Sequence, residues 1–311
     1  MAIKISGSTI IDDGRSLVNV GVSTISGDLH VGTGVTVFSS TGIVSATAYH
    51  HSDGTFLGFR QDVQDNLYAG TCAGAASDAD TGCNIALGRC AGASLNEGDR
   101  NILLGCQSGC GLTNGKYNIY IGASAGGATT GGCGNIGIGN LAGRCMGSGA
   151  ALHGKNIMIG ECSTRQARCG ERNVLIGEQA ATYMDYGFYN AYFGSESGMG
   201  CSTVACNVPL YNSFFGYQSG KCTSAGKCNT FLGAQSGNTN TTGCLNVAIG
   251  YDVELPNATD NYQFAIGALT NRWIVGNNNF NVGIGTTNPD PAVGVGNTAK
   301  LSVGIVSAYQ L

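Results

Sequence analysis

Apolar and polar positions along most of this chain alternate within a short motif that returns at a nearly constant interval. The motif reads Asn, apolar residue, any residue, apolar residue, Gly, and thirteen copies begin between residues 66 and 281. The copies open at Asn66, Asn84, Asn101, Asn118, Asn135, Asn156, Asn173, Asn190, Asn212, Asn229, Asn246, Gln263 and Asn281. Most intervals are 17 or 18 residues, and two are extended to 21 and 22. A fixed short period predicts a solenoid, in which each repeat is one coil that buries its apolar side chains only against its neighbours.

The alternating positions of the motif predict one short strand in each coil. The fifth residue is Gly in every copy, and we expect a corner there because Gly reaches positive φ without steric cost. The residue before this Gly is predicted to form the core, and the residue two positions earlier lies on the same face because side chains alternate along a strand. The expected core column is Ala69, Leu87, Leu104, Ile121, Ile138, Ile159, Ile176, Phe193, Phe215, Leu232, Ile249, Ile266 and Ile284. The column two positions earlier begins Leu67, Ile85, Ile102, Ile119, Ile136, Ile157 and Val174.

The residue between these two columns is predicted to point the other way, and it is often large. Examples are Tyr68, Leu103, Tyr120, Met158, Leu175, Tyr192, Phe214 and Phe231. A second apolar face on a solenoid one coil thick needs a cover, and we expect partner subunits to pack there. The opening Asn residues are expected to stack their amides into a ladder. A small residue followed by Gly, as in Ala91 and Gly92, is expected to close the next bend.

These patterns predict an all-β protein, a parallel β-solenoid (β-roll or β-helix) of 17-residue coils within a fibrous homotrimer. We expect three regions: a region of short alternating strands without the period over residues 1–60, the β-solenoid of thirteen repeats over residues 61–287, and a carboxy-terminal strand module over residues 288–311. Twelve steps of about 4.8 Å between thirteen copies would give a rod of about 58 Å.

Composition supports a fibre over a globular enzyme. The 311 residues include 52 Gly, and only 11% are charged, whereas average proteins have about 7% Gly and about 25% charged residues. A net charge of −4 without a Lys/Arg cluster argues against nucleic acid as a partner. No run of 18 apolar residues occurs and the amino terminus has no secretory apolar core, so we expect neither membrane insertion nor export by a signal of its own.

Fourteen Cys are unusual, and several share repeat columns, as do Cys72, Cys90 and Cys162. The favoured interpretation is a thiol that fills a small apolar slot where other coils have Ala, Ser or Gly. Disulfides between coils or subunits, and a metal or redox role, are the alternatives. Without a signal peptide we expect folding in a reducing cytoplasm.

The repeat resembles the head repeats of trimeric autotransporter adhesins and the Asn-Xaa-Ala-Ile-Gly-Tyr repeats of phage tail fibres. The nearest single copy is Asn246 to Tyr251. The segment that begins Ile3-Lys4-Ile5-Ser6-Gly7 also resembles the amino termini of virion appendage proteins from cyanophages. The resemblance implies that residues 1–25 attach to the particle and other virion proteins. Near the other end, Gly283-Ile284-Gly285-Thr286-Thr287 is similar to a tail-fibre segment that often precedes a releasable chaperone.

Two insertions interrupt the period, at residues 144–155 and 199–211. A solenoid accepts insertions only outside its stacked core, so we expect these loops to project and to be candidate contacts with a receptor; neutral drift in loop length is the alternative. Exposed aromatic residues are typical sugar-stacking platforms, but the favoured interpretation is that they cover the second apolar face. The receptor-contact candidates are Met199, Cys201, Tyr211, His153, Tyr183, Tyr186, Tyr189 and Trp273.

Catalytic and metal chemistry finds weak support. Glu161 and Glu178 share a column in adjacent coils, about 5 Å apart, which is compatible with a retaining glycosidase, but a solvated corner of mixed charge is the favoured interpretation. Only His50 and His51 are adjacent among the four His. We therefore expect no enzyme activity, no cofactor and no metal.

The resemblance implies a phage virion structural protein, a tail fibre or similar appendage, that adheres multivalently to a glycan or protein of the host cell surface. It would assemble in the host cytoplasm and act on the extracellular virion. The alternative is a capsid, neck or spacer fibre without adhesion. An ice-binding solenoid is disfavoured, because Thr residues form no continuous column.

Overall fold

The computed structural model describes residues 3–5, 8–11, 60–145, 154–166, 169–200, 208–286 and 301–303. The chain divides into two compact units, Met1–Phe56 and Leu57–Leu311. In the first unit, β1 (Ile3–Ile5) and β2 (Ser8–Ile11) form an antiparallel pair. The other strands predicted before residue 60 lie outside the described residues.

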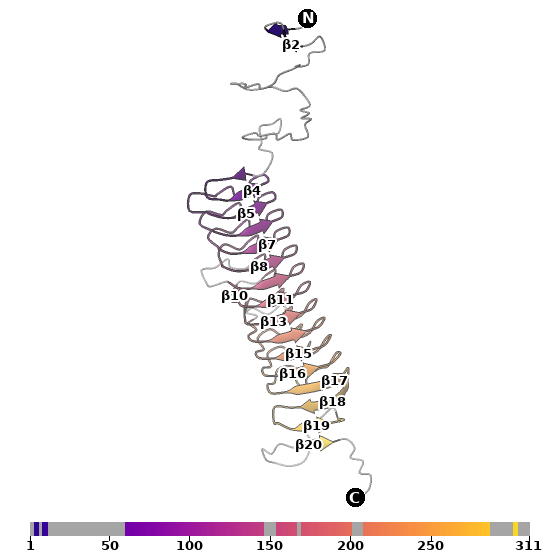
Figure 1. Cartoon of the computed structure of the whole chain (residues 1–311). Helices are drawn as coiled ribbons and strands as arrows, with labels where there is room; N and C mark the ends of the chain where they lie inside the picture. Colours follow the sequence, from indigo (N-terminus) through magenta and orange to yellow (C-terminus); the bar gives the residue numbers. More distant parts are fainter. Residues whose placement is uncertain are drawn as a thin grey trace. The chain divides into compact units, whose positions relative to one another are not determined.

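The second unit is built on one sixteen-stranded sheet whose strands stack along the axis of the unit (Figure 1). Twelve consecutive strands pair in parallel with matched register, which confirms the predicted parallel β-solenoid with coils of 17 residues. These strands are β4 (Leu67–Ala69), β5 (Ile85–Leu87), β6 (Ile102–Leu104), β7 (Ile119–Ile121), β8 (Ile136–Ile138), β9 (Ile157–Ile159), β11 (Val174–Ile176), β13 (Ala191–Phe193), β14 (Ser213–Phe215), β15 (Thr230–Leu232), β16 (Val247–Ile249) and β17 (Phe264–Ala268). At roughly 4.8 Å per strand, the eleven steps between them span about 53 Å.

The parallel stack is bounded at both ends by antiparallel strands. β3 (Arg60–Gln61) pairs with β4, and β18 (Asn271–Gly276) pairs with β17. β19 (Val282–Ile284) then pairs with β18, and β20 (Leu301–Val303) is parallel to β19. The period predicts that the thirteenth repeat stacks directly on the twelfth. In the structure β18 lies between them, so this prediction was wrong. The twelfth copy has Thr270 and Asn271 where most coils have the small residue and Gly of the second bend, and its chain reverses instead.

A second, shorter parallel ladder lies one bend before the main sheet. It contains β10 (Cys169–Glu171) and β12 (Tyr186–Phe188), and single bridges such as Lys116 to Cys133 and Leu210 to Lys227 extend it along neighbouring coils. The coils between Lys116 and Lys227 are thus paired with their neighbours at two places.

The predicted Asn ladder is present inside the solenoid. Asn84 donates from its backbone nitrogen and from Nδ2 to Oδ1 of Asn66, at 2.8 and 3.0 Å, and Nδ2 also donates to the Gly98 carbonyl at 2.8 Å. The same bonds recur coil after coil, and the Asn residues are buried. Burying an amide is tolerated because its donors and acceptor all find partners.

The prediction of which strand column forms the core was wrong. The middle residue of each strand is buried: Tyr120, Tyr192, Phe214 and Phe231 are each 0% exposed, and the Phe214 ring stacks on Tyr192 and Phe231 with centroids 4.7 and 4.8 Å apart. The predicted core column faces outward, and Leu232 is 49% exposed. The Asn ladder sets this parity, because the opening Asn points inward and alternation then turns the middle strand residue inward as well.

The predicted Gly corner is confirmed, together with its cause. Gly177 has φ +144°, and a Cβ there would lie 2.2 Å from the carbonyl oxygen of Gly194 in the next coil. The second bend also matches its prediction, since Ala91 is buried and Gly92 has φ +57°. The coil can therefore turn sharply at these positions while its backbone stays in contact with the neighbouring coils.

Candidate functional site: the outer aliphatic face

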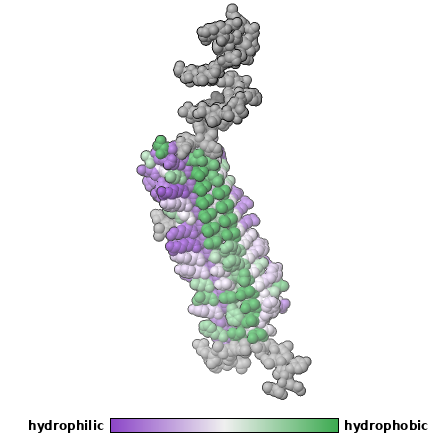
Figure 2. All heavy atoms as spheres, in the orientation of Figure 1, coloured by the Kyte–Doolittle hydropathy of each residue, from purple (hydrophilic) through white to green (hydrophobic). Residues whose placement is uncertain are grey.

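The surface of the solenoid carries a largely apolar strip, which we call the outer aliphatic face. It consists of the first and third residues of the twelve parallel strands, which point away from the Asn ladder, and Figure 2 shows it as a green band along the rod. The first residues are Leu67, Ile85, Ile102, Ile119, Ile136, Ile157, Val174, Ala191, Ser213, Thr230, Val247 and Phe264. The third residues are Ala69, Leu87, Leu104, Ile121, Ile138, Ile159, Ile176, Phe193, Phe215, Leu232, Ile249 and Ile266. None of these positions is charged.

Side chains of the face are covered along the axis by their neighbours in the adjacent coils. Their outer tips remain open to solvent. Phe193 and Phe215 stack with centroids 4.8 Å apart, yet Phe215 is still 41% exposed. Ile138 is exposed to a similar degree. The stacking makes the strip regular, and the remaining exposure is a recurring cost that another apolar surface would remove.

Two columns of side chains border the face. The residue before each opening Asn forms the leading edge: Asp65, Cys83, Arg100, Tyr117, Gly134, Lys155, Arg172, Tyr189, Tyr211, Cys228, Leu245 and Tyr262. The residue after each corner Gly forms the trailing edge: Thr71, Arg89, Cys106, Ala123, Asn140, Glu161, Glu178, Ser195, Tyr217, Ala234, Tyr251 and Ala268. All leading-edge residues have positive φ, a conformation that turns the chain from the shorter ladder into the main strand.

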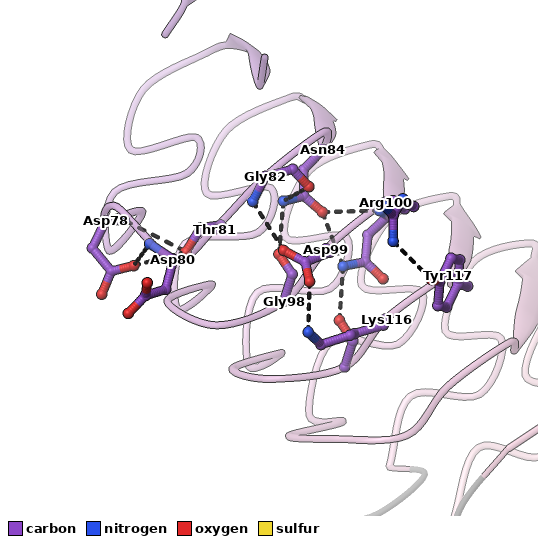
Figure 3. Close-up of polar contacts among 12 residues, drawn as sticks. Asp78, Asp80, Thr81, Gly82, Asn84, Gly98, Asp99, Arg100, Lys116 and Tyr117 are labelled. Carbon is purple, nitrogen blue, oxygen red and sulfur yellow. Dashed lines mark hydrogen bonds and ion pairs between the residues drawn. The ribbon is translucent and has the colours of Figure 1, made fainter. Parts of the chain in front are cut away.

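Contacts between coils order the leading edge. In Figure 3, Arg100 donates from Nη1 to the Tyr117 hydroxyl at 2.7 Å. Beside this pair, Lys116 lies 2.5 Å from Asp99, and its hydrogen bond holds the pKa of the Asp99 carboxyl below the usual value. These side chains on and beside the leading edge are therefore held by contacts between adjacent coils.

The predicted receptor-contact residues are only partly brought together. Arg172 donates to the Tyr189 hydroxyl, and the Tyr189 ring stacks on Tyr211 with centroids 5.0 Å apart. Tyr183, Tyr186 and Met199 are half-buried, and Trp273 is 64% exposed on β18. His153 and Cys201 lie outside the described residues.

The weaker chemical candidates remain unassembled. Glu161 and Glu178 lie in one column of adjacent coils, as predicted, but both are exposed on the trailing edge, where Glu161 accepts a hydrogen bond from Asn140 at 3.3 Å. Within the described ranges, no group of three His, Cys, Asp or Glu side chains is placed to hold a metal. His50 and His51 lie outside these ranges.

The slot interpretation of the cysteines was wrong for one column. Cys72, Cys90 and Cys162 occupy a left-handed corner, with φ between 55° and 60°, that turns the side chain outward, and Cys72 is exposed. All three are free thiols. The corner accepts Gln, Ser and Leu in other coils, so its occupants are not selected for a small apolar space.

The fold and its surface define a parallel β-solenoid repeat protein with one uncharged aliphatic face. No protein family, curated protein or solved structure matches the chain. In the part of the chain that the structure describes, no helix is long and apolar enough to cross a membrane.

Proposed function

We propose that this chain forms the shaft of a homotrimeric fibre, held together by the outer aliphatic face, and that the fibre is a structural part of a phage tail fibre or similar virion appendage. The observation that carries the proposal is the length of the face and its lack of charge: twelve strands contribute two outward side chains each, none of them charged and all but Ser213 and Thr230 apolar. The strand face on which partner subunits are expected from the sequence, with Tyr120 and Phe214, is instead the buried interior.

A second copy of the chain is the occupant that fits this face best. The face repeats at every strand, about every 4.8 Å, and a partner keeps the same contacts over its whole length only if its own surface has the same repeat. Another copy has that repeat by construction.

The face supplies part of the area that association needs. A strip about 53 Å long and about 10 Å wide offers roughly 500 Å² on each chain. In a cyclic trimer each chain uses this strip and its bordering edges against two neighbours, so three interfaces share the burial. The strip alone therefore supplies roughly 500 Å² to each of the three interfaces, and the bordering edges must supply the rest of the 1,200 Å² or so at the lower end of specific complexes.

The appendage role rests on the resemblance of the repeats to those of phage tail fibres, together with the rod geometry. A stiff rod that presents three equivalent surfaces suits multivalent adhesion, in which several weak contacts combine. The exposed Tyr189–Tyr211 stack is one candidate contact. A spacer that carries another protein at its tip is the alternative, and immunogold labelling of virions distinguishes the two by position. A particle fraction without label would reject both.

Light scattering of the purified chain in reductant tests the assembly. We expect a mass of three times 31.6 kDa, and the double variant Leu104→Asp with Ile121→Asp should give the monomer mass, since buried carboxylates oppose the interface. Ala128→Asp is the matched control because Ala128 is exposed elsewhere on a coil. A monomeric wild-type chain would contradict the proposal, and a trimeric double variant would place the interface elsewhere.

A further inference from the structure

The edges of the outer aliphatic face hold a charge pattern that specifies how copies are oriented. Resting on the proposed self-association, we propose that the copies associate in parallel and in register, with the leading edge of each copy paired to the trailing edge of its neighbour. Two ion pairs in each interface, Lys155 with Glu161 and Arg172 with Glu178, would then fix the direction.

The four charged residues flank the same two strands, β9 and β11, on opposite sides of the face. Lys155 and Arg172 lie on the leading edge beside β9 and β11, and Glu161 and Glu178 lie on the trailing edge of the same two strands. All four residues are exposed. No other layer carries opposite charges on its two edges.

These charges cannot pair across the face within one copy. Arg172 and Glu178 lie six positions apart, which is up to about 20 Å in an extended chain, whereas an ion pair needs about 4 Å. The ion pairs among the described residues, Lys116 with Asp99 and Lys221 with Glu196, involve none of the four.

Like charges are stacked in each edge column. The register that pairs Val174 with Ile157 places Arg172 beside Lys155 and Glu178 beside Glu161, about 4.8 Å apart along the axis. Like charges directly opposite one another in a sheet are destabilising. Within one copy Arg172 donates to the Tyr189 hydroxyl and Glu161 accepts from Asn140, but neither partner carries an opposite charge. A neighbouring edge of opposite charge would relieve the repulsion in both columns.

Symmetry determines which edges meet. A rotation axis parallel to the rod keeps every strand at its own height, so the leading edge of one copy meets the trailing edge of the next copy at the same strand. Lys155 then faces Glu161 of the neighbouring copy, and Arg172 faces its Glu178. No layer brings two like charges together: Arg89 faces Cys83, for example.

A reversed copy would be disfavoured by the same residues. β9 and β11 are the sixth and seventh of the twelve parallel strands, so a fully overlapped antiparallel pair places β9 against β11 and joins leading edge to leading edge. Lys155 would then face Arg172, and Glu161 would face Glu178. The central position of the charged layers therefore selects the parallel arrangement.

Zero-length carbodiimide cross-linking of a mixture of ¹⁴N- and ¹⁵N-labelled protein tests the edge pairing. We expect mass spectrometry to find an amide bond between Lys155 and Glu161 in peptides of mixed isotope, which proves a link between copies. An intact trimer that gives no such link would overturn the proposed pairing while leaving the proposed fibre in place. A monomeric wild-type chain would overturn both.

Charge reversal adds a test whose sign depends on direction. In the parallel arrangement Arg172→Glu should weaken the trimer about tenfold in dissociation constant, because three interfaces each lose one pair, and adding Glu178→Arg should restore it. In an antiparallel arrangement Arg172→Glu would instead strengthen association, by facing Lys155. Arg165→Glu, at an exposed position away from both edges, controls for the change in net charge. A trimer unaffected by Arg172→Glu would contradict the ion pair.

Discussion

Replacing one amide of the Asn ladder should be far more damaging than its size suggests, and Asn173→Ala is the clearest case. Nδ2 of Asn173 donates to Oδ1 of Asn156 at 2.9 Å and to the Gly187 carbonyl at 2.7 Å, and Oδ1 accepts from the backbone nitrogen and Nδ2 of Asn190, both at 3.0 Å. Four hydrogen bonds at about 1 kcal/mol each give a loss of about 4 kcal/mol. Leaving the Gly187 carbonyl and the Asn190 N–H buried without partners places the loss at or above that value.

The loss can be measured by guanidinium unfolding followed by circular dichroism, with wild type and variant at one fixed protein concentration, because the stability of an oligomer depends on concentration. Hydrogen exchange of the Asn190 amide should accelerate at the same time, since its acceptor is removed. Asn96→Ala is the matched control: Asn96 is exposed and lies on neither edge of the outer aliphatic face, so the expected change is below about 0.5 kcal/mol. A loss under about 1 kcal/mol for Asn173→Ala, with unchanged exchange of Asn190, would refute the argument that the ladder stabilises the stack.

Two further predictions concern a corner and a half-buried acid. Gly177→Ala should lower the free energy of unfolding by at least about 3 kcal/mol, because its Cβ would meet the Gly194 carbonyl. In the control Gly285→Ala, φ is +69° and nothing lies within 4 Å of the new Cβ, so the loss should be only about 1 kcal/mol. Equal losses of the two variants in thermal unfolding would contradict the clash. Burial raises the pKa of the Glu254 carboxyl above its ordinary 4.5, so the folded state binds that proton more tightly and stability falls as pH rises through the raised pKa. Glu254→Gln should therefore raise Tm at about pH 7 and leave it unchanged at about pH 3; an equal effect at both pH values would contradict this assignment.

Much of the fold follows from the sequence because its determinants are local and repeated. The corner at Gly177 requires φ +144° and close backbone approach, and only Gly provides both, so a column of Gly predicts the turn directly. The ladder from Asn66 onward likewise follows from one residue type in one column. By contrast, the period does not predict the reversal at β18, because it depends on the pairing of Asn271–Gly276 with β17.

The sequence pattern could not, by itself, say which strand face is inside. Both faces are apolar, and the uniform Ile and Leu columns look more like a core than the mixed column does. A signal was nevertheless present in the alternation of large and small residues, because Tyr120 is followed in the next coil by Gly137. A Cβ at Gly137 would lie 2.8 Å from Cδ1 of Tyr120, so only Gly leaves room for the ring. Compensation of this kind is required only in an enclosed interior. The candidate face was missed for the same reason, since it depends on that parity.

Because the twelve parallel strands share one register, the length of the rod is set by the number of its coils. An interior coil donates to the coil on one side and accepts from the coil on the other through the same groups wherever it lies, so inserting or deleting one 17-residue unit leaves the remaining bonds as they were. Each such change alters the length by about 4.8 Å. Recombination between neighbouring repeats of the gene could thus tune the reach of the fibre in fixed increments without redesigning either end, provided that every subunit in the assembly carries the same number of coils.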